Sequence, residues 1–122
     1  MDSERIRQIL VVEDDQTMLS LLDTLLEMEG FDVTQVKDYE SALESMRQAP
    51  PDLVILDVYL NDRSGLDLME VIRKDGSLKA TRVIMSSGMD FRSQCLEKGA
   101  DDFVMKPYMP EELVEKIHKL IH

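Results

Sequence analysis

The 122-residue chain has no tryptophan, one cysteine, four prolines and five glycines. A single cysteine excludes an internal disulfide, which suits a reducing compartment. No apolar run approaches the roughly 20 residues that span a bilayer, and the polar start of the chain does not resemble a signal peptide. We therefore expect a cytoplasmic protein that folds as one domain and does not enter membranes.

Positive charge is also scarce in this chain. Lysine and arginine total 14 residues against 25 aspartates and glutamates, which gives a net charge of −11. Such a surface repels the phosphate backbone of nucleic acids and anionic lipid headgroups. We expect no direct nucleic-acid or membrane binding, whereas basic faces of partner proteins would be attracted.

The apolar residues that are present change their spacing repeatedly. Strand-like runs are expected at residues 9–12, 31–36, 53–58, 82–86 and 102–105, each followed by an amphipathic helix. Helix boundaries are indicated by Asp15, Gly30, Asp38, Pro50, Ser64, Asp75, Gly99 and Pro110. Because right-handed crossovers force a parallel sheet, the order predicts an α/β three-layer sandwich around a doubly wound five-stranded parallel sheet. The run 53–58 is the most apolar and is expected at its centre.

Polar residues follow four of these runs at their carboxyl ends. Glu13-Asp14-Asp15 follows the first run, Asp57 the third, Ser86-Ser87 the fourth and Lys106-Pro107 the fifth. The carboxyl ends of parallel strands share one edge of a sheet, where ligands bind. Carboxylates, a hydroxyl and an ammonium group at one edge predict a site for a divalent cation and a phosphoryl group.

The methionines and histidines are expected to be structural. Six methionines fall on apolar stripes and are predicted to fill the core: Met18, Met28, Met46, Met69, Met85 and Met105. Met89 and Met109 are expected near the site and partly exposed, and His118 and His122 on a solvated helix face.

In order and spacing, these motifs resemble the receiver domain of two-component response regulators. The motifs are at residues 9–15, Leu56-Asp57, Gly65, 83–88 and 99–107, and the resemblance covers about residues 6–121. It implies a flavodoxin-like sheet with strand order 2-1-3-4-5. We expect residues 1–122 to form one stand-alone receiver domain.

The resemblance implies a role for each acidic residue of the site. Asp57 would accept the phosphoryl group, and Mg²⁺ would be held by Asp14, Asp57 and the backbone carbonyl of Tyr59. Glu13 would act on the cation through water, and Asp15 would cap the first helix.

The same resemblance assigns the remaining polar residues. Lys106 would pair with a phosphoryl oxygen, and its peptide bond to Pro107 would be cis. Family register selects Ser87 rather than Ser86 as the hydroxyl that moves toward the phosphoryl group. Phe103 occupies the aromatic switch position, although a plain core aromatic is an equal alternative.

One departure from the family pattern, and two variable positions that flank the phosphoryl group, concern the loops around Asp57. Asn61 stands where many receivers have proline, which predicts a more mobile loop and a less certain place for the Tyr59 carbonyl. Tyr59 and Met89 would flank the phosphoryl group, and neither offers a carboxylate or carboxamide that orients an attacking water. We therefore expect slow self-dephosphorylation.

The resulting hypothesis is a phosphorylation-controlled switch that is not an enzyme. A sensor histidine kinase or a phosphotransfer protein would supply the phosphoryl group, and the face of the fourth helix, fifth strand and fifth helix would bind a downstream target. We expect a monomer or a weak dimer.

Three alternatives belong to other classes. A degenerate receiver would act as an interaction module alone. A Mg²⁺-dependent phosphohydrolase of the haloacid dehalogenase type would need an Asp-x-Asp pattern after the first strand, which Glu13-Asp14 does not supply. A flavodoxin would need a loop rich in Ser, Thr and Gly there, and the acidic loop would repel its FMN phosphate.

Overall fold

Five strands and five helices alternate along the chain. A computed structural model describes residues 5–61 and 63–121. The strands are β1 (Gln8–Val12), β2 (Asp32–Val36), β3 (Leu53–Asp57), β4 (Arg82–Ser87) and β5 (Asp102–Met105). The helices are α1 (Gln16–Met28), α2 (Tyr39–Gln48), α3 (Gly65–Lys74), α4 (Arg92–Glu97) and α5 (Pro110–Leu120).

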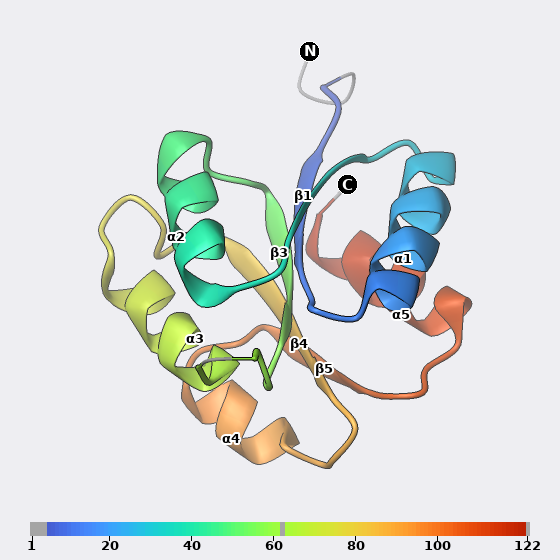
Figure 1. Cartoon of the computed structure of the whole chain (residues 1–122). Coiled ribbons are helices and arrows are strands. Elements are labelled where there is room, and N and C mark those ends of the chain that lie inside the picture. The colour runs from blue at the N-terminus through green and yellow to red at the C-terminus, as the bar shows by residue number, and fades with distance from the viewer. Residues whose placement is uncertain (1–4, 62, 122) are drawn as a thin grey trace.

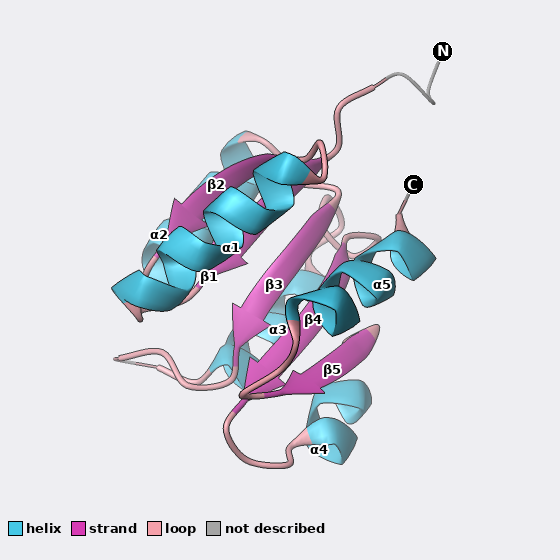
Figure 2. Ribbon diagram, turned by 90° about the vertical axis from the view of Figure 1, so that its right-hand side faces the viewer, coloured by secondary structure: helices cyan, strands magenta, loops and turns pink. Residues whose placement is uncertain are grey.

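The strands form one parallel sheet in the order β2-β1-β3-β4-β5. Helices α1 and α5 cover one face, and α2, α3 and α4 cover the other (Figures 1 and 2). The predicted three-layer sandwich, its strand order and the central place of β3 are therefore confirmed. Every residue of β3 is buried, because a strand between two covered faces has no side open to water.

Side-chain alternation along the strands divides the core into two halves. In β1, Ile9 and Val11 pack with the residues of α1 and α5, whereas Leu10 and Val12 pack with those of α2 and α3. Successive side chains of a strand point to opposite faces, so a short apolar run can serve both layers. This alternation also decides the face toward which each polar residue at the end of a strand points.

Local signals fix the helix ends. Asp15 accepts hydrogen bonds from the amides of Thr17 and Met18 and so caps α1, and Asp38 caps α2 in the same way through Ser41. Gly30 and Gly99 follow α1 and α4 with φ of 93° and 103°. Glycine suits these two positions because a side chain strains a backbone with positive φ.

Two of the methionines predicted to lie in the core are exposed. Met28 is 79% exposed and Met105 48%. Met28 lies off the buried stripe formed by Leu19, Leu22 and Leu26 in α1. Met105 ends the edge strand β5, where α4 has six residues and is too short to cover the end of the sheet.

The other methionine and histidine predictions fare differently. Met46, Met69 and Met85 are fully buried, and Met18 is partly buried against the α1–α5 half of the core. The side chain of His118 is about half exposed and lies 3.4 Å from Glu29, whereas His122 falls outside the described residues. Within residues 5–61 and 63–121, no helix combines the length and the apolar character that crossing a bilayer requires.

Gly65 has no room for a side chain. Its amide donates to the carbonyl of Val58 at 2.6 Å, and a Cβ atom at this position would overlap the carbonyl oxygen of Asp57. We expect Gly65→Ala to lower the free energy of unfolding in urea by about 3 kcal/mol, because the backbone below Asp57 would have to move. Gly76→Ala is the matched control, since a Cβ there meets nothing within 4 Å, and equal stability of the two variants would contradict this account.

Candidate functional site

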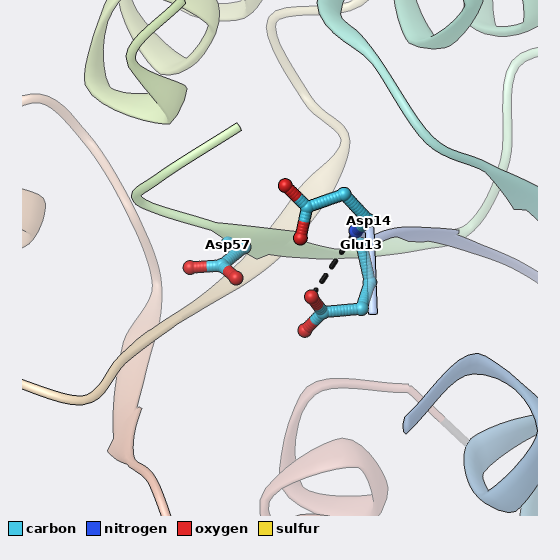
Figure 3. Close-up of side chains that lie close together, drawn as sticks. All are labelled: Glu13, Asp14 and Asp57. Carbon is cyan, nitrogen blue, oxygen red and sulfur yellow. Dashed lines mark hydrogen bonds between the residues drawn. The ribbon is translucent and has the colours of Figure 1, made fainter. Parts of the chain in front are cut away.

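Three carboxylates gather at the carboxyl edge of the sheet. Glu13 and Asp14 follow β1, Asp57 ends β3, and the two strands are neighbours. One oxygen of each carboxylate lies within 4.8 Å of one oxygen of the other two, and Figure 3 shows the side chains converging. Glu13 and Asp57 are buried, whereas Asp14 is partly exposed. The structure therefore brings together the acidic residues that the sequence predicted as a cluster.

The ammonium group of Lys106 lies between two of these carboxylates. Its Nζ is 2.6 Å from Oε1 of Glu13 and 2.9 Å from Oδ2 of Asp57. The Lys106 amide donates to the carbonyl of Ser87, and the Lys106–Pro107 peptide bond is cis. Lys106 thus links the loop after β5 to the ends of β1 and β3.

The second oxygen of Glu13 organises the turn into α1. Oε2 accepts hydrogen bonds of 3.1 Å from the amides of Asp14 and Asp15 (Figure 3 draws the first). Asp15 in turn caps the helix. Of three consecutive acidic residues, Glu13 binds Lys106 and its own turn, Asp15 binds the helix, and Asp14 keeps its carboxylate beside the cluster.

The electrostatic environment of the site favours a positive charge. Burial raises the pKa of Glu13, and the nearby charge of Asp57 adds to this, although the hydrogen bond from Lys106 opposes it. Burial lowers the pKa of Lys106, but its hydrogen bonds to Asp57 and Glu13 outweigh that effect and hold the pKa above its ordinary value. A cation added beside Asp14 would relieve the remaining repulsion among the carboxylates.

The backbone of Tyr59 faces Asp57. The amide of Tyr59 donates to Oδ1 of Asp57 at 3.1 Å. Tyr59 also pairs with Ser64 in an antiparallel bridge whose hydrogen bonds run from Leu60 to Arg63 and from Gly65 to Val58. In this pattern Tyr59 is a non-hydrogen-bonded residue, so its N–H and C=O both point away from Ser64. The Tyr59 carbonyl therefore lies on the same side of the chain as the Asp57 carboxylate.

This pairing bears on the expected effect of Asn61. The sequence predicted a more mobile loop because proline is missing at that position. In the structure, residues 58–60 and 63–65 form an antiparallel pair, which we call the hairpin, and the amide of Leu60 donates to the carbonyl of Arg63 at 3.2 Å. The connection from β3 to α3 thus has a defined path at Tyr59 without the proline.

Ser87 and Phe103, which the sequence predicted as switch residues, are buried. The Oγ of Ser87 accepts a hydrogen bond from the amide of Met89, so here the hydroxyl is engaged by its own loop. Ser86, its neighbour, is also buried and lies opposite Asp57 in the pairing of β3 with β4. The Phe103 ring points inward and packs in the half of the core covered by α3 and α4. A plain core aromatic, the alternative to the switch role, would pack in the same way.

Tyr108 lines the site, and sequence reasoning did not identify it. Burial raises the pKa of its phenol to about 12. Its hydroxyl lies 3.8 Å from the sulfur of Met18, which joins the loop after Lys106 to the first turns of α1. Its position two residues after Lys106 was the signal in the sequence that could have placed it at the site. The residue type alone does not indicate that the ring turns inward.

Comparisons with known proteins decide the family. A family model for the response regulator receiver domain matches residues 9–118. The chain belongs to this family. The resemblance noted in the sequence is therefore confirmed. Receiver domains of two-component systems take part in phosphorylation-dependent signalling and are not enzymes in the ordinary sense.

The relatives also set the limits of the assignment. The chain is 39% identical to the DNA-binding response regulator MtrA of Mycolicibacterium smegmatis over 117 residues, which are 96% of this chain and 51% of that protein. The chain thus spans about half the length of the curated relatives it matches. The activity, targets and partners of those longer proteins are therefore not transferred as established facts.

Solved structures give the same fold. A putative response regulator from Chloroflexus aurantiacus matches with a TM-score of 0.90 at 28% identity, covering 95% of this chain and 98% of that one. The receiver domain of a sensor histidine kinase from Pseudomonas aeruginosa matches with a TM-score of 0.87 at 25% identity, covering 96% and 98%. The latter structure contains a magnesium ion coordinated in its active-site cleft.

Lys106→Met tests the electrostatic balance of the site. Without the ammonium group, Glu13 and Asp57 face each other as buried like charges, so we expect the metal-free variant to lose about 2 kcal/mol of unfolding free energy near neutral pH. The pKa of Glu13 would rise further above its unfolded value. Because such a carboxyl binds its proton more tightly in the folded state, the loss should shrink as pH falls toward about 5.

The measurement is urea unfolding in the presence of a chelator at both pH values. Lys119→Met is the control, because Lys119 is an exposed lysine paired with Glu115 one helical turn away, and it should be neutral at both. A deficit in Lys106→Met that is the same at both pH values would argue against repulsion between the two carboxylates.

Proposed function

We propose that Asp57 is the phosphoryl acceptor of this receiver domain. The observation that carries the proposal is the arrangement of its carboxylate, which is held by the Lys106 ammonium on one oxygen and by the Tyr59 amide on the other. About a tenth of the Asp57 side chain remains exposed, so a donor can reach it from the carboxyl edge of the sheet. The family assignment supports this choice of residue, since Asp57 ends the central strand.

The chemistry is the transfer of one phosphoryl group from a phosphohistidine to the carboxylate of Asp57. An Asp57 oxygen attacks the phosphorus of a phosphohistidine, an O–P bond forms as the N–P bond breaks, and the imidazole leaves with the bonding pair and takes a proton. Lys106 lies within hydrogen-bond distance of Asp57, where its ammonium pairs with an oxygen of the incoming group. In this role the domain assists its own phosphorylation without turning over a separate substrate.

A divalent cation fits the same edge. Glu13, Asp14 and Asp57 supply clustered carboxylate oxygens, and the Tyr59 carbonyl faces the same side as Asp57, which is the all-oxygen donor set that Mg²⁺ favours. As the family resemblance implies, we assign direct contacts to Asp14, Asp57 and the Tyr59 carbonyl. We assign a water-mediated contact to Glu13, whose carboxylate already accepts three hydrogen bonds, from Lys106 and from the amides of Asp14 and Asp15. Bound Mg²⁺ would supply positive charge that offsets the charge of the transferred group.

We assign the response to phosphorylation to the loop after β4 and to the face formed by α4, β5 and α5. Ser87 would exchange the Met89 amide for a phosphoryl oxygen and draw the loop before α4 with it. Phe103 lies on the same face of the sheet as Met85, under the guanidinium of Arg92 from α4, so movement of that loop would reach the ring. Exposed Leu96 and Met105 give the α4–β5–α5 face apolar area for a protein target.

The partners follow from the family and the charge. We propose a sensor histidine kinase or a phosphotransfer protein as donor and a downstream protein as target, with basic contact surfaces that suit a domain of net charge −11. We also propose that the domain is a monomer or a weak dimer and that it is cytoplasmic. The cytoplasm is a reducing compartment, in which the buried thiol of Cys95 persists.

Intact mass spectrometry tests the proposal. Incubation with acetyl phosphate and Mg²⁺ should add the mass of one phosphoryl group to the wild type and nothing to Asp57→Asn. Asp52→Asn is the matched control, since Asp52 precedes the same strand at its other end, and it should react normally. Excess chelator should abolish the addition. A wild type that never gains the mass would indicate a degenerate receiver, and one that gains it elsewhere would displace Asp57 from this role.

The lifetime of the phosphorylated form gives a second test. Tyr59 and Met89 are exposed and offer no side-chain carboxylate or carboxamide to orient water, so we expect slow loss of label. Tyr59→Asn should shorten the half-life by roughly tenfold or more, because its carboxamide can position water. Tyr59→Phe should leave it unchanged. A wild-type half-life of seconds would refute the inference.

A further inference from the structure

Arg63 joins the segment between β3 and α3 to helix α2, which otherwise takes no part in the site. Its guanidinium carbon lies 3.6 Å from the centroid of the Tyr39 ring, and its Nη1 lies 3.3 Å from Oε1 of Glu40. Tyr39 is the first residue of α2 and is 4% exposed, packed in the core beneath α2 and α3. A cation stacked on a ring that is fixed in the core has a fixed position itself.

The backbone of Arg63 transmits that position to Tyr59. The Arg63 carbonyl accepts the Leu60 amide at 3.2 Å, and the next residue, Ser64, pairs directly with Tyr59. The hairpin is thus closed at Arg63 on one strand and at Leu60 on the other. Tyr59 lies one residue from this closure, with its amide on Asp57.

We propose that Arg63 is a positioning residue for the divalent cation: its stack on Tyr39 holds the hairpin so that the Tyr59 carbonyl faces the acidic cluster. The inference rests on the proposed cation site. Asn61 lacks the ring by which a proline would fix φ, so other contacts must restrain the loop. In this chain the contact between Arg63 and Tyr39 supplies it.

The sign of the expected effect separates this role from simple electrostatics. Arg63 is a positive charge on a loop of the acidic edge, so removing it should strengthen the binding of a dication if charge alone mattered. If the stack positions the carbonyl, removing it should weaken binding instead. The two explanations therefore predict opposite shifts in the dissociation constant for Mg²⁺.

The experiment is a calorimetric Mg²⁺ titration of the whole chain and its variants at one ionic strength. We expect Arg63→Ala to raise the dissociation constant about fivefold, the effect of about 1 kcal/mol for one partly exposed cation–π contact. Hydrogen exchange of the Leu60 amide should accelerate in the same variant, because the backbone carbonyl of residue 63 that accepts its hydrogen bond would no longer be held by the stack. Thermal unfolding in a chelator shows whether each variant remains folded.

Matched variants isolate the stack. Tyr39→Phe keeps the ring and should bind Mg²⁺ as the wild type does, whereas Tyr39→Leu removes it and should resemble Arg63→Ala. Combining Arg63→Ala with Tyr39→Leu should cause little further loss if the two residues act as one unit. Glu40→Gln removes the ion pair alone and should not weaken binding, and Arg47→Ala removes a charge of α2 that pairs with Asp75 and should not weaken it either.

The outcomes are distinguishable from failure of the proposed function. A wild type that binds no Mg²⁺ would overturn the cation site itself. A wild type that binds Mg²⁺, together with an Arg63→Ala variant that binds as tightly or more tightly, would overturn the role of Arg63 and leave the site intact. Weaker binding in Arg63→Ala but wild-type binding in Tyr39→Leu would likewise exclude the stack as its cause.

Discussion

The ammonium group of Lys106 is the contact on which the acidic edge of this protein depends. Two buried carboxylates, on the neighbouring strands β1 and β3, point at one another, and a single cation lies between them. Since that cation comes from the loop after β5, the attraction also ties the loop that follows an edge strand to the ends of β1 and β3. The charges to which we assign phosphoryl transfer therefore also hold the parts of the site in place.

This arrangement separates the fixed parts of the site from the adjustable ones. Glu13 has both oxygens occupied by hydrogen bonds, and Asp57 has one contact on each oxygen. Asp14 is partly exposed, and Ser87 is held by a single bond to the amide of Met89. A phosphoryl group on Asp57, as proposed above, would thus reach the loosely held Asp14 and Ser87 while Glu13 keeps its hydrogen bonds to the turn into α1.

The alternation of short apolar runs and amphipathic helices allowed the parallel sheet and the clustering of polar residues at its carboxyl edge to be predicted, whereas the strand order came from the resemblance to the receiver family. The sequence did not reveal which surfaces remain uncovered. Met105 is exposed because α4 is short and β5 lies at an edge, and both facts concern neighbours rather than Met105 itself. The contact between Arg63 and Tyr39 was equally hidden, since it joins residues whose approach depends on how α2 packs.

At the opposite end of the sheet, one side chain joins three segments. Arg73, near the end of α3, donates to the carbonyls of Lys79, Thr81 and Gly99 and to the carboxylate of Asp101. These acceptors lie just before β4 and β5, so the starts of both strands are pinned to α3. The ends of the same strands carry Ser87 and lead into Lys106. The starts of β4 and β5 are therefore cross-linked through one side chain, so a shift at Ser87 or in the loop that carries Lys106 would be confined to the carboxyl edge of the sheet.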